Sequence, residues 1–212
     1  MRGSVRVRIL SRVGSVEARV MTSLGFPLEI RPHALNLHAL ASGPWTPAAI
    51  RRACKANGWA FVKDHPRAKG FSFRLDRELR LSAVFEPFPS VPAPHCHVLL
   101  YLHAPANYPR HKFPEDARDH FDGALEASFD TLVAELGDPE SYEVHEIGWD
   151  IEPCYAYAIW RARSGLLVLQ QEEYDLYCGE FAVSVYLHPW GEADPAPGLP
   201  LAIWGPGLPR TA

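Results

Sequence analysis

The sequence has no run of about 18 apolar residues, so it offers no segment that could cross a membrane as a helix. Residues 1–10 carry arginines between their apolar positions and so lack the uninterrupted apolar stretch of a signal peptide. The cytoplasm is therefore the expected compartment, and no membrane partner is expected. The four cysteines show no C-x-x-C spacing, and without an export signal we expect reduced, mostly buried thiols at Cys54, Cys96, Cys154 and Cys178.

Catalytic and cofactor-binding motifs are also lacking. The sequence has no G-x-S-x-G elbow, no Walker loop and no G-x-G-x-x-G turn. His145 and Glu146 begin like the zinc motif H-E-x-x-H, but the second histidine is missing. We therefore predict a protein that is not an enzyme and needs no cofactor.

Charge is divided sharply along the chain. Residues 1–113 carry 17 Lys and Arg against 6 Asp and Glu, whereas residues 114–194 carry 3 Arg against 19 acids. The overall net charge of −4 conceals this division. A segregated charge of this size points to interaction with a charged partner rather than to a particular fold.

Periodicity predicts one helix in each half. Thr46 and Pro47 suit the start of a helix over residues 48–57, which Gly58 ends. A second helical pattern runs over residues 114–136 and ends at Gly137. Alternating apolar residues predict strands at 70–75, 79–85, 96–103, 155–161, 166–171 and 181–187.

The last strands of the two halves resemble each other. Residues 98–103 and 183–188 are identical at four of six positions, at a constant offset of 85 residues. We interpret the fold as α+β, with a largely antiparallel sheet or sheets and two main helices, from a diverged duplication of a helix-plus-three-strand unit. Chance similarity between alternating strands is the alternative.

This interpretation divides the chain into four parts. Residues 1–42 form an N-terminal extension or hairpin, in which translation starting at Met21 is an alternative to Met1. Residues 43–113 form a basic α+β unit and residues 114–190 an acidic one. Residues 191–212 form an irregular tail rich in Pro and Gly.

The best metal-binding candidate is the pair His95 and His97. On a strand, both side chains point to the same face, where two imidazoles could share an ion. His103, His111 or His120 could supply a third ligand. The basic surroundings disfavour a cation and no second ligand motif is present, so a metal-dependent protein or enzyme centred on this pair is kept as the alternative function.

Nucleic acid is not an expected partner. The basic first half would attract phosphate, but the acidic half beside it would repel phosphate. No RNP-type or zinc-finger signature accompanies the basic residues.

The acidic half predicts a protein-binding surface, because acids there alternate with aromatic residues of the kind that dominate interfaces. Its partner would be a basic protein. An uncharacterised structural or regulatory module remains possible if the two halves neutralise each other and the aromatics fill the core. The predicted partner-binding residues are Glu143, Glu146, Asp150, Glu152, Trp160, Glu172, Glu173, Tyr174, Asp175, Tyr177 and Glu180.

Residues 129–190 resemble a pattern found among bacterial immunity proteins that accompany polymorphic toxins. The matching pieces are Phe-Asp-Thr-Leu at 129–132, Leu-Gly-Asp-Pro at 136–139, Ala-Ile-Trp-Arg at 158–161, Leu-Val-Leu-Gln at 167–170, Val-Ser-Val-Tyr-Leu at 183–187 and Pro-Trp at 189–190. The resemblance implies a non-catalytic inhibitor that covers the active site of a co-encoded toxin, often with an acidic face. It implies no individual functional residue and does not extend to the first half.

Overall fold

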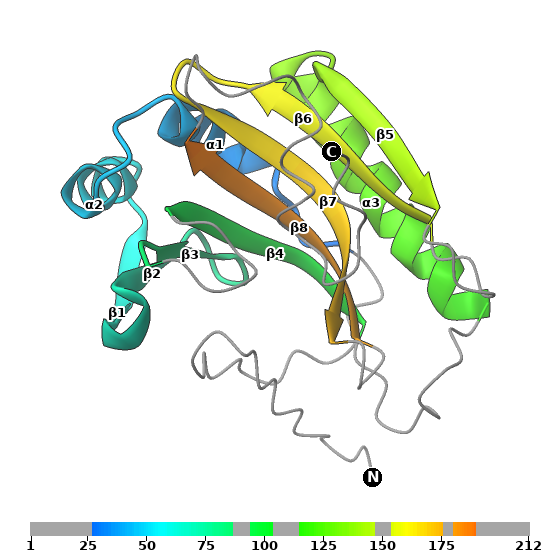
Figure 1. Ribbon diagram of the computed structural model, residues 1–212, viewed down its shortest axis with the longest axis horizontal. Coiled ribbons are helices and arrows are strands. Elements are labelled where there is room, and N and C mark those ends of the chain that lie inside the picture. The colour runs from blue at the N-terminus through cyan, green and yellow to red at the C-terminus, as the bar shows by residue number, and fades with distance from the viewer. Residues whose placement is uncertain (1–26, 87–93, 104–114, 147–153, 176–179, 190–212) are drawn as a thin grey trace, which may run out of the picture.

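The computed structural model describes residues 27–86, 94–103, 115–146, 154–175 and 180–189 (Figure 1). They form three α-helices, two short 3₁₀ helices and eight strands. The helices are α1 (Ala34–Ala41), α2 (Pro47–Ala56) and α3 (Glu115–Leu136), and the 3₁₀ helices are η1 (Arg31–His33) and η2 (Pro66–Ala68). The strands are β1 (Ala60–His65), β2 (Gly70–Arg74), β3 (Arg80–Val84), β4 (His95–His103), β5 (Ser141–Glu146), β6 (Cys154–Arg161), β7 (Gly165–Asp175) and β8 (Glu180–Pro189).

All eight strands belong to one sheet, in the order β1-β2-β3-β4-β8-β7-β6-β5, and every neighbouring pair is antiparallel. The α+β class and the largely antiparallel sheet are therefore confirmed. Strands β1–β4 come from the first half of the chain and β5–β8 from the second, and the halves join where β4 pairs with β8.

The two halves have the same element order. In each, a helix (α2 or α3) is followed by four strands, one more than the sequence predicted for a unit. The two similar segments, 98–103 and 183–188, lie in β4 and β8 and pair with each other across the centre of the sheet. Common ancestry of the halves stays a prediction.

The helices follow from local signals. Thr46 has an extended backbone, and its hydroxyl accepts a hydrogen bond from Ala49 N (3.3 Å), which caps α2 as predicted. Gly137 follows α3 with a φ of 83°, a left-handed conformation that favours glycine.

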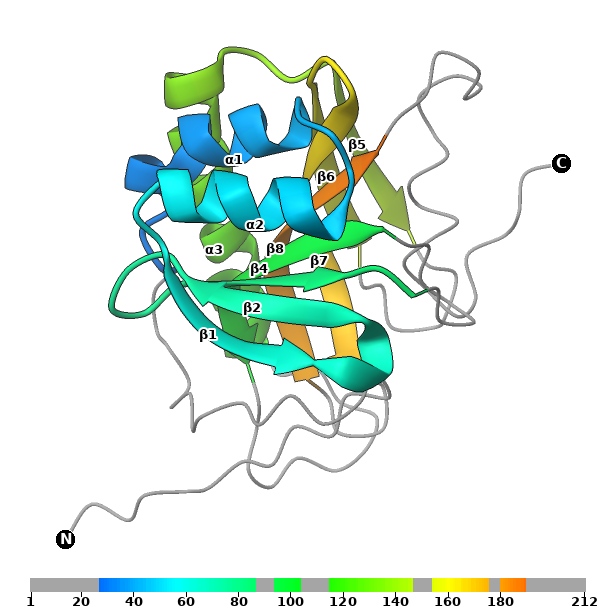
Figure 2. The same ribbon diagram turned by 90° about the vertical axis from the view of Figure 1, so that its left-hand side faces the viewer.

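The three α-helices contribute to one hydrophobic core on a single face of the sheet (Figure 2). Ile50 and Cys54 of α2, and Phe121 and Leu132 of α3, are buried in this core together with the side chains that point to the same face from the strands. Cys54 and Cys96 are free buried thiols, as expected for two of the four cysteines.

Helix α1 and the strands β1 and β5 are not among the predicted elements. Helix α1 falls in the segment assigned to an N-terminal extension, yet its Leu37 and Ala41 are fully buried. Strand β1 was missed because Lys63, Asp64 and His65 interrupt any alternation of apolar residues. The predicted hairpin in residues 1–22 and the tail over 191–212 lie outside the described residues. No described helix is long and apolar enough to cross a membrane.

Candidate functional site

The predicted acidic residues are gathered at one end of the second half of the sheet. Glu143 and Glu146 lie on β5, Glu172, Glu173, Tyr174 and Asp175 at the end of β7, and Glu180 at the start of β8. Strands β5 and β7 run in the same direction because both are antiparallel to β6, so their final residues lie at the same end. Asp150, Glu152 and Tyr177 lie outside the described residues.

Trp160 belongs to the core and not to an exposed surface. Its side chain is only 3% exposed, and its indole N–H donates a hydrogen bond to Gly137 O (2.8 Å) at the end of α3. Its ring also packs against Phe129 of α3, with centroids 6.0 Å apart. The aromatic position that the sequence assigned to partner binding is thus used to hold α3 on the sheet.

Helix α3 adds acids that the sequence reasoning did not select. Asp119, Glu126 and Asp130 are exposed and recur at helical spacing. Beside them, β5 exposes Tyr142, whose side chain is 51% accessible and lies edge-on to Phe129 (5.2 Å between centroids). Strand β5 together with Asp119, Glu126 and Asp130 of α3 is called the acidic edge below.

The seam between the halves carries almost no charge. Strand β4 has no Asp, Glu, Lys or Arg, and β8 has only Glu180, which pairs with Asp175 of β7 and not with β4. The two halves therefore do not neutralise each other where their strands meet. Figure 1 shows β1 and α2 at one side of the molecule and β5 and α3 at the other, so the bases on β1 and α2 lie away from the acids on β5. Arg31 of η1 is closer to the acidic half, with its Nη1 3.8 Å from Oε1 of Glu135 on α3. Exposed bases on the first side include Arg52, Lys55, Arg67, Arg74 and Arg77.

A histidine cluster lies on the sheet face opposite the helices. His97 stacks on Tyr186 of β8, with centroids 4.6 Å apart, and its Nε2 lies 3.1 Å from Ser184 Oγ. His95 and His188, which are 6% and 5% exposed, lie 6.2 Å apart between ring centroids. The structure therefore joins the predicted His95 and His97 to His188, which the sequence reasoning did not consider.

Burial, with a smaller contribution from the nearby His95, lowers the pKa of His97 and of His188 to about 3. Both rings are accordingly neutral at pH 7. In the part of the chain that the structure describes, no three His, Cys, Asp or Glu side chains are placed so that they could hold a metal ion together. The described geometry of this cluster therefore gives a metal site no support.

Two neighbouring glutamines of β7 have opposite environments. Gln171 donates to Asp122 Oδ1 of α3 (2.8 Å) and accepts from Ala156 N of β6 (3.0 Å). Gln170 points to the other face and is 1% exposed, and neither its amide nitrogen nor its amide oxygen has a hydrogen-bond partner. Among the described residues, no hydrogen bond compensates the free energy that is lost when the amide of Gln170 is removed from water.

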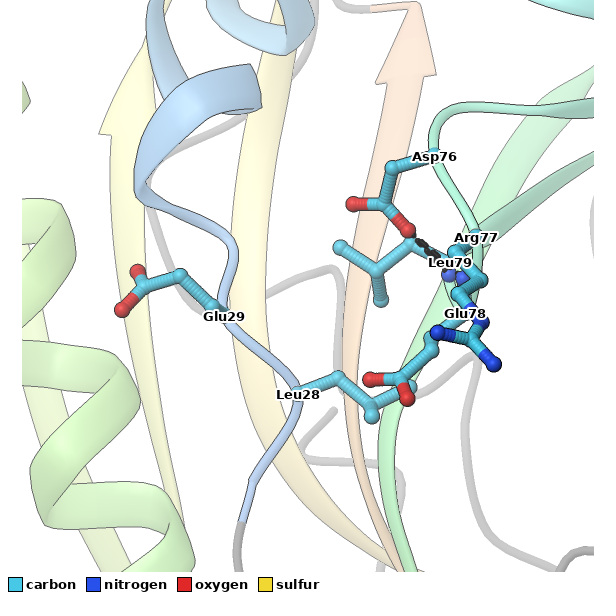
Figure 3. A pocket seen from close by; sticks show the side chains of 6 residues that line it. All are labelled: Leu28, Glu29, Asp76, Arg77, Glu78 and Leu79. Carbon is cyan, nitrogen blue, oxygen red and sulfur yellow. Dashed lines mark hydrogen bonds between the residues drawn. The ribbon is translucent and has the colours of Figure 1, made fainter.

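A shallow pocket of about 290 Å³ lies between the segment before η1 and the turn that joins β2 to β3 (Figure 3). Leu28 and Leu79 give it apolar surface, and the remaining lining residues are Glu29, Asp76, Arg77 and Glu78. Its volume is at the lower limit for small-molecule sites.

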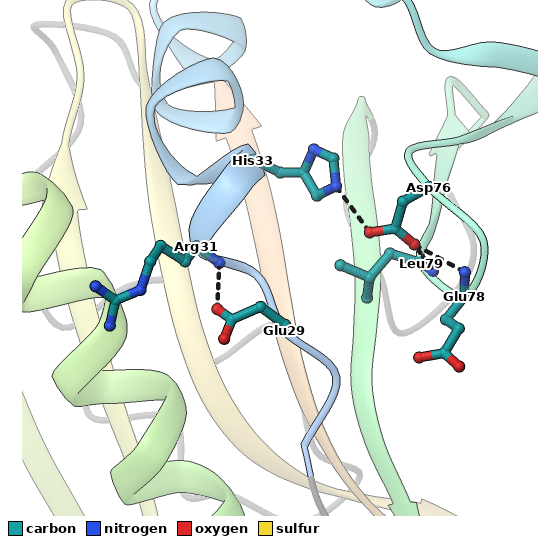
Figure 4. Close-up of polar contacts among 6 residues, drawn as sticks. All are labelled: Glu29, Arg31, His33, Asp76, Glu78 and Leu79. Carbon is teal, nitrogen blue, oxygen red and sulfur yellow. Dashed lines mark hydrogen bonds and ion pairs between the residues drawn. The ribbon is translucent and has the colours of Figure 1, made fainter.

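Asp76 in this pocket has a structural task. Its Oδ1 accepts hydrogen bonds from Glu78 N (2.7 Å) and Leu79 N (2.8 Å), and its Oδ2 lies 2.8 Å from Nε2 of His33 (Figure 4). Burial raises the pKa of Asp76, but the two backbone donors and His33 outweigh this and leave the pKa below its usual range. The carboxylate therefore stabilises the β2–β3 turn and links it to His33 of η1.

Comparisons with known proteins found no matching family model, no matching curated protein and no matching solved structure. The resemblance to immunity proteins is therefore neither supported nor contradicted by a relative.

Proposed function

We propose that this chain is a non-catalytic protein-binding module that holds a basic protein on its acidic edge. The observation that carries the proposal is the uncharged seam. The bases of β1 and α2 and the acids of β5 lie at opposite sides of the sheet, and Glu135 is the α3 acid that pairs with a base of the first half, Arg31. The negative potential of Asp119, Glu126 and Asp130 on α3 is therefore available to attract a partner.

A basic toxin or effector encoded beside this chain is the partner that the immunity-type resemblance implies. An inhibitor of this kind needs no catalytic group, only a surface complementary to the active site that it covers. Clustered acids suit a toxin whose active site binds phosphate, since such a site is itself basic. Complementary charge would also speed the encounter of the two proteins.

Affinity purification of the tagged chain from its native cells, followed by mass spectrometry, tests this function. We expect one basic protein in stoichiometric amount. A preparation that contains no such protein would contradict the proposal.

A charge-reversal variant then tests the surface. The triple variant D119K/E126K/D130K should slow association with the captured partner by about tenfold at low salt, with a smaller effect at high salt. The control variant R52E/K55E/R67E changes three exposed charges at the opposite side of the sheet and should leave association as fast or make it faster by less than about twofold. The two variants change the net charge by the same amount in opposite directions, so an acceleration by the control as large as the slowing by the triple variant would show that net charge, and not the acidic edge, governs binding.

The alternative, a metal-dependent protein centred on His95 and His97, makes a different prediction. Replacing both histidines by alanine should then abolish metal uptake or activity, whereas the proposed partner binding should survive. Retained partner binding in the double variant, with unchanged metal content, would favour the protein-binding function.

A further inference from the structure

The sheet has two edges, and they differ in how they are protected. Strand β1 contains an irregularity in its pairing between Phe61 and Lys63, and Lys63 itself lies on this edge. Bulges and lysines are the devices by which proteins prevent a second chain from pairing with a free strand. The bulge and the lysine therefore hinder the pairing of a further strand with β1.

Strand β5 has neither device. Its six residues pair with β6 in one continuous register, from Ser141↔Ile159 to Glu146↔Cys154, and they include no Lys, Arg or Pro. No described strand pairs with the other side of β5. Among the described strands, β5 is thus the edge strand that carries neither a bulge within its pairing nor a lysine.

The hydrogen-bonding pattern identifies which backbone groups of β5 face outward. Ala156 N donates to the side-chain Oε1 of Gln171 on β7, so the backbone groups of Ala156 point away from β5. Ile159 O, three residues on, accepts from Glu140 N just before β5 and so points towards β5. Since these directions alternate along a strand, Tyr157 points towards β5 and so forms the inward pair with Glu143. The outward-facing N–H and C=O groups of β5 are therefore those of Tyr142, Val144 and Glu146.

The surroundings of this edge specify the chemistry of a strand that could pair with it. Tyr142 offers an exposed ring, which Phe129 supports from α3. Glu126 and Asp130 are exposed on the same helix, one turn before Phe129 and directly after it. A strand beside β5 would thus have an aromatic contact for an apolar side chain and carboxylates for basic ones.

We infer that the partner docks by adding an extended, basic segment to β5, as a ninth strand of the sheet. This inference rests on the proposed function and names its binding mode. Main-chain hydrogen bonds to residues 142, 144 and 146 supply affinity, and the acids of the acidic edge select lysine and arginine at alternate positions.

A synthetic peptide provides the test. The probe is an eight-residue peptide that alternates lysine and threonine, and the control is the same peptide with alternate backbone nitrogens methylated. Methylation keeps the charge but removes the donors that strand addition requires. Amide hydrogen exchange, followed by NMR on the full chain, should show slower exchange at Tyr142, Val144 and Glu146 with the probe by at least about fivefold, and no change at Phe61.

The outcomes separate the binding mode from the function. Equal protection by both peptides, or protection on α3 without protection on β5, would overturn strand addition while leaving a basic partner in place. The absence of protection at any residue would also overturn strand addition. The proposed function would then be decided by the affinity purification.

A pair of variants at one position supplies a second test. V144P removes an outward-facing N–H without breaking a bond to β6, because proline is tolerated where the N–H of an edge strand faces outward. V144T keeps the N–H. We expect V144P to weaken probe binding at least about tenfold and V144T to leave it within about twofold. Equal affinities would contradict the inference, and the methylated peptide still decides the question if V144P fails to fold.

Discussion

The ring of His97 on β4 stacks on the ring of Tyr186 on β8, with centroids 4.6 Å apart and planes inclined by 21°. These two residues are cross-strand partners in the pairing that joins the halves of the sheet. The pair of strands at the centre of the sheet is thus held by neutral, stacked rings and by apolar side chains, and β4 and β8 carry almost no charged residues.

The histidines on β4 and β8 should make the protein less stable as the pH is lowered. Because the pKa values of His97 and His188 are lowered to about 3 in the fold and lie near 6.5 in an unfolded chain, only the unfolded chain takes up these protons between pH 6.5 and 3. Stability is therefore fully present above pH 6.5 and falls as the pH is lowered. We expect a loss of at most about 2 kcal/mol per histidine between pH 6.5 and 5, measured by urea unfolding. The H97Q/H188Q variant should show a flatter profile, and a profile as steep as that of the unmodified chain would assign the acid sensitivity to other groups.

The contribution of Asp76 to the stability of the protein should be lost over a different pH range. Its pKa is lowered in the fold, so its contribution is present above the carboxyl pKa of the unfolded chain and disappears as the pH falls through the folded value. The D76N variant should be less stable by about 1–2 kcal/mol at pH 7, because it weakens the acceptor for Glu78 N, Leu79 N and His33. The E78Q variant changes an exposed carboxylate in the same turn and serves as the control, with a change within about 0.5 kcal/mol. Similar losses in both variants would mean that the cap contributes little.

The sequence predicted the parts of the fold that have strong local signals. Thr46, Pro47 and Gly58 delimit α2, and the alternation in β4 and β8 is clear because these strands carry almost no charge. Strand β1 was not predicted because an exposed edge strand does not need alternating apolar and polar residues.

The candidate site was harder to foresee. The burial of Trp160 depends on Phe129 and on the end of α3, and the approach of His188 to His95 depends on strand pairing between residues about 90 apart in sequence. No local pattern contains either fact. The charge division, by contrast, is visible in the composition, although only the strand order shows that the two halves lie on opposite sides of the β4–β8 pair.

Replacing Gln170 by an apolar residue should raise the free energy of unfolding. Its buried amide has no hydrogen-bond partner, so a leucine of similar size removes the desolvation cost. We expect Q170L to gain about 1–2 kcal/mol in urea unfolding, whereas Q171L should lose about 1–3 kcal/mol because it breaks bonds to Asp122 and Ala156. A loss in Q170L would show that the amide has a partner in solution, and a search for a ligand on that face would follow.

Two glycines should respond to alanine in opposite directions. At Gly165, which begins β7, a Cβ atom would lie 2.3 Å from His188 O and 2.6 Å from Ala41 O, so the strand would have to move away from β8 and from α1. G165A should therefore destabilise the protein by at least about 2 kcal/mol. At Gly123, exposed in the interior of α3, a Cβ atom would meet nothing within 4 Å, and alanine should add about 1 kcal/mol through helix propensity. Thermal unfolding of both variants checks this pair, and a stable G165A would mean that the junction of α1, β7 and β8 is looser than the structure shows.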